Sequence, residues 1–163
     1  MSDDDRRTWL RQRFGVISDE TLGQLEDLEE LRWPDFSLNV PIEDGELRYA
    51  LITDIEEHVQ RIARIYRDGL DEALGNEDYS WHHDPREIVA RHRGGDWRFY
   101  GAFHDGILAG VESVHILRGP RIMQCVWGCV HPDYRTIGIW RNVARYNDEI
   151  VRRSGAQMGI AWA

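Results

Sequence analysis

The stretch VHPDYRTIGIW, Val130 to Trp140, has the pattern of a strand end, a proline-containing loop and the start of a helix with a glycine in it. A helix start presents backbone N–H groups that have no partner within the helix, together with the positive end of the helix dipole. It therefore attracts phosphate without any lysine. Gly138 would let a phosphate group approach the backbone closely, and Arg135 adds a positive charge beside it. A pyrophosphate is the ligand that suits this arrangement.

Hydrophobic periodicity predicts the elements that precede this stretch. Residues 47–52 form a short strand, and residues 53–74 carry apolar side chains at helical spacing on one face. Asp84 followed by Pro85 predicts the start of a second helix, because these residues suit the N-cap and the first helical position. The period then changes to two and predicts three antiparallel strands, the first pair joined by a tight turn at residues 104–106.

Beyond the opening stretch, apolar residues at helical spacing predict a third helix, and the apolar residues 156–163 predict a buried strand. Residues 123–162 would then form a parallel strand–helix–strand crossover. Residues 1–45 are predicted to be a helical extension that ends in a turn-rich connection at 41–45, and residues 46–163 to be the main domain.

This order of elements, with the run V-H-P-D-Y-R-x-x-G-I at residues 130–139, resembles the GNAT superfamily of N-acetyltransferases. The likeness extends from about Leu47 to Ala163. It implies an α+β fold in which helices flank a mixed, mostly antiparallel sheet, here truncated after the fifth strand. It also implies acetyl-CoA as cosubstrate and a primary amine of a small molecule or a protein as acceptor.

The resemblance also implies which residues bind acetyl-CoA. In that family, R/Q-x-x-G-x-G/A cradles the pyrophosphate, and the preceding strand binds the pantetheine arm through its backbone. Trp140 stands where Gly or Ala is usual, so binding depends on where its indole points. The implied pantetheine contacts are Gly128, Cys129 and Val130, and the implied pyrophosphate loop comprises Arg135, Thr136, Ile137, Gly138, Ile139, Trp140 and Arg141.

The catalytic groups depart from the family pattern. Gln124 occupies the strand position where several members carry a catalytic Glu, and an amide cannot accept a proton usefully. Glu112 and His115 on the neighbouring strand are the substitutes, but strand alternation sends them to opposite faces, so at most one faces the cleft. The family's usual general acid is a Tyr in a helix that would follow Ala163.

The segment between the two predicted helices, GNEDYSWHHDP, would border the acceptor. Its charges and aromatic rings could hold an ammonium group by charge and cation–π contact, or it could be a solvated loop with one Trp anchored in the core. His82 and His83 are adjacent and lack a third ligand at suitable spacing, so no metal site is expected. The candidate acceptor-binding residues are Glu77, Asp78, Tyr79 and Trp81.

Composition restricts the partners. The 163 residues carry a formal net charge of -9, and all 20 basic residues are Arg, so neither nucleic acid nor an anionic membrane is an expected partner. The sequence shows no signal peptide and no membrane-length apolar run, which predicts a cytoplasmic protein.

Two questions stay open at the level of sequence. A chain ending at Ala163 would expose a strand edge, so either the sequence is a fragment or a partner, such as a second copy in a homodimer, covers that edge. Trp140 and Gln124 also favour an alternative function, a GNAT-like module that binds acyl-CoA or a protein without turnover. A helix-plus-sheet interaction protein is the third interpretation.

Overall fold

The computed structural model describes Thr8, residues 41–70, 81–117 and 122–139, and the single residues Asn142, Val143, Tyr146, Glu149, Ile160 and Ala161. The predicted N-terminal helix lies outside these residues. In the described part of the chain, none of the helices combines the length and the apolar character that crossing a membrane requires.

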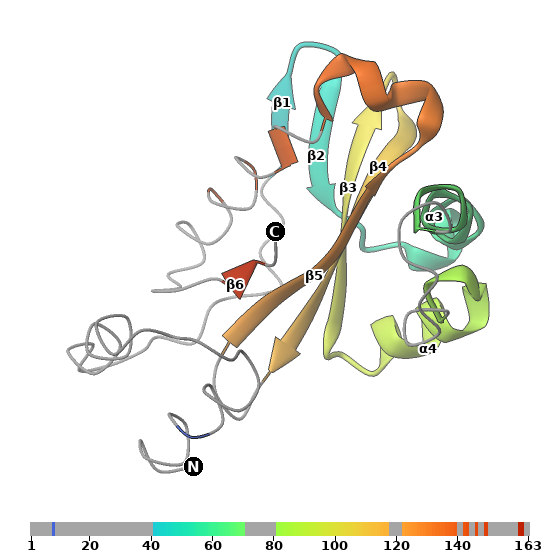
Figure 1. Ribbon diagram of the computed structural model, residues 1–163, viewed down its shortest axis with the longest axis vertical. Helices are drawn as coiled ribbons and strands as arrows, with labels where there is room; N and C mark the ends of the chain where they lie inside the picture. The colour runs from blue at the N-terminus through green and yellow to red at the C-terminus, as the bar shows by residue number, and fades with distance from the viewer. Residues whose placement is uncertain are drawn as a thin grey trace, which may run out of the picture.

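The described strands form one six-stranded sheet whose order in space follows the chain (Figure 1). Pairing is antiparallel from β1 to β5 and parallel between β5 and β6. The predicted α+β class, with a mostly antiparallel sheet and a parallel crossover, is therefore confirmed. The strands are β1 (Ile42–Asp44), β2 (Leu47–Leu51), β3 (Trp97–His104), β4 (Ile107–Leu117), β5 (Ile122–Val130) and β6 (Ile160–Ala161).

One prediction about the first strand was incomplete. Residues 41–45 were expected to be a turn-rich connection, but Ile42–Asp44 form β1, which pairs with β2 across a turn at Gly45. Gly45 has a φ of 63°, in the left-handed region that glycine adopts at no steric cost. A strand of three residues is too short to give a periodic signal, which is why the sequence showed only the turn.

Two helices, α3 (Ile55–Leu70) and α4 (Pro85–Arg93), pack on one face of the sheet (Figure 1). The start of α4 is as predicted: the Asp84 carboxylate accepts a 2.8 Å hydrogen bond from the Arg86 N–H, and Pro85 occupies the first turn. The α3 helix buries one stripe of side chains, formed by Ile55, Val59, Ile62 and Tyr66.

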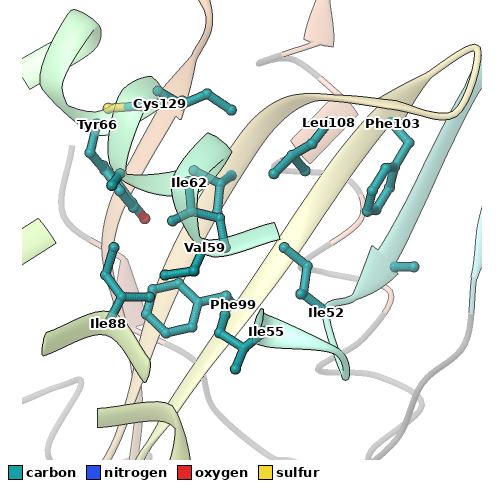
Figure 2. Packing of buried hydrophobic residues seen from close by; sticks show 14 residues of the cluster. Ile52, Ile55, Val59, Ile62, Tyr66, Ile88, Phe99, Phe103, Leu108 and Cys129 are labelled. Atoms are coloured by element: carbon teal, nitrogen blue, oxygen red, sulfur yellow. The ribbon is translucent and has the colours of Figure 1, made fainter. Parts of the chain in front are cut away.

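Apolar side chains cover both faces of the sheet. The helix-side core lies between the sheet and α3 and α4, and Figure 2 shows Phe99 of β3 packed among Ile55, Val59 and Ile88. The opposite core contains the Tyr49 and Tyr100 side chains of the sheet, covered by a further helix. This helix follows the short 3-10 helix η2 (Pro132–Ile137), and its described residues are Ile139, Asn142, Val143, Tyr146 and Glu149.

The turn between β3 and β4 has the conformation that its sequence predicted. Asp105 and Gly106 both have positive φ angles, 50° and 78°, as a two-residue hairpin turn of the primed type requires. The strands that it joins bring Trp97 opposite His115 and Tyr100 opposite Glu112. This register places the two candidate bases, His115 and Glu112, on opposite faces of the sheet.

Candidate functional site

Strand β5 contains a bulge in the middle of the sheet. Ser113 of β4 pairs with Trp127 and the next residue, Val114, pairs with Cys125, so Val126 is an extra residue in β5. Because of this insertion, Trp127 packs against the helix-side core and Cys125 against the opposite core, although strict alternation would put them on one face. The pairing with β6 is described only for Gln124 and Cys125, immediately before the bulge.

After the bulge, the β5 backbone directs two amide groups away from β4. The His131 N–H donates a 2.9 Å hydrogen bond to the Ala109 carbonyl, which makes these two residues a hydrogen-bonded pair. In an antiparallel ladder such pairs alternate with pairs whose N–H and C=O groups point outward. Gly128 and Val130 are of the second kind, so their N–H and C=O groups lie on the β6 side of β5. This is the backbone edge that could bind an extended ligand.

The loop after β5 ends in a glycine-dependent turn. The His131 side chain accepts a hydrogen bond from the Asp133 N–H and caps η2, and Gly138 ends η2 with a φ of 78°. The buried Ile139 is then helical. The predicted helix start is therefore present, but it lies at Ile139, after Gly138 rather than around it, because Ile137 still belongs to η2 and Gly138 ends it. A Cβ atom on Gly138 would meet nothing within 4 Å, so open space adjoins this backbone.

The candidate cofactor residues differ in exposure. Thr136 and Ile137 are exposed, as is Arg135, whose guanidinium donates a 3.4 Å hydrogen bond to the Asp68 carbonyl in the last turn of α3. That contact ties the loop to the end of a helix, where the dipole favours a cation. Trp140 and Arg141 lie outside the described residues.

Cys129 lies in β5 between Gly128 and Val130, and its thiol faces the helix-side core beside Tyr66 (Figure 2). The Cys129 sulfur would lie only 3.1 Å from a Cβ atom on Gly69, so α3 approaches β5 closely here. Burial raises the pKa of the Cys129 thiol to about 12, against a smaller lowering by the Arg135 charge. The thiol is thus protonated at neutral pH and unsuited to nucleophilic chemistry.

We expect an aromatic disulfide reagent at pH 8 to label Cys125 in the folded protein and to label Cys129 only after unfolding. Cys125 is partly exposed, whereas Cys129 is buried and lacks thiolate character. The measurement is the number of thiols titrated with and without denaturant. The Cys125→Ser variant is the control, and rapid labelling of this variant in its native state would contradict the placement of Cys129.

The two candidate bases lie on opposite faces of the sheet, as predicted. The His115 ring stacks on Trp97 at a centroid distance of 4.4 Å on the helix side, and it is partly exposed. Glu112 pairs with Tyr100 of the opposite core and is only 6% exposed. Gln124 lies directly opposite His115 and shares its face. His115 is therefore the accessible one of the two.

The candidate acceptor segment is only partly described, since Glu77, Asp78 and Tyr79 lie outside the described residues. Trp81 stacks on His82 at 3.6 Å, and the Arg91 guanidinium lies 4.3 Å from its ring centroid. Trp81 therefore has a cation–π partner within the chain already. Among the described residues, Glu46, His104 and Asp105 form one group of possible metal ligands, and both of its carboxylates are exposed. This group lies at one end of β4, and His115 lies towards the other end.

Sequence reasoning missed a buried polar network next to the bulge. The His82 Nε2 atom lies 3.1 Å from the Ser113 hydroxyl, and both residues are fully buried. The hydroxyl groups of Ser113 and Tyr66 donate hydrogen bonds to the Trp127 carbonyl, at 3.4 and 3.0 Å. Burial raises the pKa of Tyr66 well above its ordinary value, so its hydroxyl keeps the proton that it donates. The sequence offered one signal of this network, the polar Ser113 on the inward face of a strand.

Comparison with known proteins gives structural matches to the fold but no match to a sequence family. No family model matches the sequence, and no curated protein is significantly similar to it. PaiA N-acetyltransferase from Thermoplasma acidophilum, solved in complex with coenzyme A, has a TM-score of 0.55 over 71% of this chain and 79% of its own, at 16% identity.

Two further solved structures agree. A GNAT family acetyltransferase from Brucella melitensis in complex with acetyl-CoA has a TM-score of 0.56, covering 74% of this chain and 77% of its own, at 17% identity. An aminoglycoside acetyltransferase from an uncultured soil metagenomic sample, in complex with sisomicin, has a TM-score of 0.56, covering 74% and 79%, at 12% identity. The protein therefore has the fold of the GNAT acetyltransferases, and identities this low establish the fold alone.

Proposed function

We propose that the protein transfers an acetyl group from acetyl-CoA to a primary amine of a small molecule or a protein. The observation that carries the proposal is the β5 edge beyond the bulge, where Gly128 and Val130 direct backbone groups outward, followed by Gly138 and a helix start. Solved structures of this fold contain coenzyme A or acetyl-CoA. The net charge of -9 favours an acceptor that approaches as a cation.

The residues present suit such a cosubstrate. The outward backbone groups of Val130 would bind the pantetheine arm, and the helix start at Ile139, with Arg135 beside it, would bind the pyrophosphate. The open space at Gly138 would leave that backbone accessible. Acetyl-CoA would supply the acetyl group as a thioester. The Gly128 N–H would stabilise negative charge on its carbonyl oxygen during transfer, because the Val130 N–H lies about 7 Å further along the strand and cannot reach the same oxygen.

The reaction also needs a proton acceptor. The amine nitrogen attacks the thioester carbon, the carbon–sulfur bond breaks, and one proton leaves the nitrogen as the thiolate takes one up. We assign to His115 the removal of the proton from the amine nitrogen, because His115 is partly exposed. It also lies on the same face of the sheet as Gln124, the β5 residue directly opposite it, which pairs with β6. Glu112 is buried in the opposite core, where an acceptor amine would have to displace packed side chains.

One observation favours the alternative of an acyl-CoA-binding or protein-interaction module without turnover. Gln124 is buried at the strand position where a proton-accepting carboxylate would serve catalysis, and its amide cannot take that role. The division between residues 1–45 and 46–163, the cytoplasmic location and a homodimer remain predictions from the sequence.

The test combines thermal melting with a thiol-release assay over a panel of primary amines, including aminoglycosides and peptide N-termini. Acetyl-CoA at about 100 times its Kd should stabilise the folded state by about 2.7 kcal/mol and raise the melting temperature. Thiol release that depends on the amine would support the enzyme. A melting shift without thiol release would support the binding module, and no shift at saturating acetyl-CoA would contradict both.

A further inference from the structure

The Trp127 carbonyl and the Gly128 N–H belong to one peptide group. A trans peptide is planar, and its C=O and N–H point in opposite directions. No described peptide bond is cis. Whatever fixes the direction of the Trp127 carbonyl therefore also fixes the direction of the Gly128 N–H, which lies on the outward edge of β5. The interactions of this one carbonyl thus bear directly on the candidate thioester site.

Two side-chain hydroxyls donate to that carbonyl from the core. Tyr66 of α3 donates at 3.0 Å and Ser113 of β4 at 3.4 Å. A Ser hydroxyl has only one proton, so Ser113 must accept when it bonds to a second partner. When Ser113 donates to the Trp127 carbonyl, its hydroxyl accepts from the His82 Nε2 atom, 3.1 Å away, in the tautomer that carries the ring proton on this nitrogen. The chain of donation runs from His82 to Ser113 to the Trp127 carbonyl.

The surrounding core holds these donors in place. His82 is fully buried, stacked on Trp81 at 3.6 Å and in edge contact with Tyr66 at 4.6 Å. Ser113 is fully buried as well. A peptide group is polarised when its carbonyl oxygen accepts hydrogen bonds, and the bonds of such a chain strengthen one another by about 10–30% each. The Gly128 N–H is therefore both aimed and strengthened as a donor.

We infer that His82, Ser113 and Tyr66 are positioning residues that orient and polarise the Trp127–Gly128 peptide, so that the Gly128 N–H donates to the carbonyl oxygen of the bound thioester. The inference rests on the proposed acetyl transfer. None of the three side chains needs to touch the substrate, because each acts through the backbone of β5.

The first test uses the free protein and does not depend on activity. In ¹H–¹⁵N spectra, Ser113→Ala and His82→Leu should move the Gly128 amide proton resonance upfield and speed its exchange, whereas Ser113→Thr and His82→Gln should retain the wild-type values. Ile88→Val in the buried part of α4 is the control, because it loosens the same core without removing a hydrogen-bonding group. A Gly128 resonance that is unchanged in Ser113→Ala, or that moves equally in Ile88→Val, overturns the inference.

The second test uses turnover. Ser113→Ala and Tyr66→Phe should each lower kcat about tenfold while KM for the amine stays within twofold, and Ser113→Thr should restore kcat. The loss should stay below the roughly 10²–10³-fold that follows removal of an oxyanion donor outright. Equal losses in Ser113→Thr and Ser113→Ala overturn the inference. If the wild type releases no thiol, the proposed enzyme has failed, and the Gly128 resonance alone decides whether the network orients this amide.

Discussion

His115→Phe is expected to lower kcat for amine acetylation by about 10²–10⁴-fold, the usual contribution of a general base. A Phe ring keeps the stacking contact that His115 makes with Trp97 at 4.4 Å, so the local packing survives while the proton acceptor is lost. Melting of the variant, and its shift with acetyl-CoA, should therefore remain close to wild type. The measurement is thiol release under saturating acetyl-CoA across pH 6 to 9.

The matched variant for this prediction is Glu112→Gln, on the same strand but on the other face of the sheet. Its carboxylate is 6% exposed and paired opposite Tyr100, so we expect an acceptor amine not to reach it and kcat to change less than tenfold. A large loss in Glu112→Gln together with a small loss in His115→Phe would reverse the assignment. Small losses in both would mean that neither residue takes the proton.

Gly138→Val is expected to abolish the stabilisation by acetyl-CoA, about 2.7 kcal/mol at 100 times the Kd. The φ of 78° at Gly138 is a genuine outlier for a β-branched residue, so the backbone between η2 and the next helix must change. Strain of this kind costs of order 1–3 kcal/mol, which should also lower the melting temperature of the free protein. The measurement is the melting shift with and without acetyl-CoA.

Two controls separate the causes of that loss. Gly45→Val places the same side chain at a φ of 63° in the β1–β2 turn, so it should lower stability and leave the acetyl-CoA shift intact. Gly138→Asn should fold normally, since Asn tolerates positive φ, and its response to acetyl-CoA reports whether the site needs bare backbone. A full acetyl-CoA shift in Gly138→Val would mean that the pyrophosphate site lies elsewhere.

The helices and strands were largely predictable because their signals are local. Asp84 and Pro85 fix the start of α4 through one N-cap and one fixed φ angle, and Asp105 and Gly106 fix a hairpin turn. The helix after η2 was expected to include Gly138 but begins only at Ile139, because nothing in the sequence distinguishes a 3-10 turn from the first turn of an α-helix.

The candidate site was predictable only in part. The loop from Arg135 to Gly138 was identified as a motif, and its glycine proved to need a left-handed conformation. The opposite placement of Glu112 and His115 followed from strand alternation, but the choice between them did not, because burial depends on which elements cover each face. In the buried polar network, the hydrogen bond between His82 and Ser113 joins residues 31 positions apart, and the bond from Tyr66 to the Trp127 carbonyl joins residues 61 positions apart. No local sequence pattern predicts contacts over such separations.

The sequence by itself determined the order of the elements, the periodicity that buries one face of each, and the turns that need glycine, because these depend on residues close together in the chain. Only the tertiary structure decided the bulge at Val126 and hence which backbone amides of β5 face outward. A bulge arises when two strands pair with unequal numbers of residues, so the register between β4 and β5 sets it and neither strand's own sequence does.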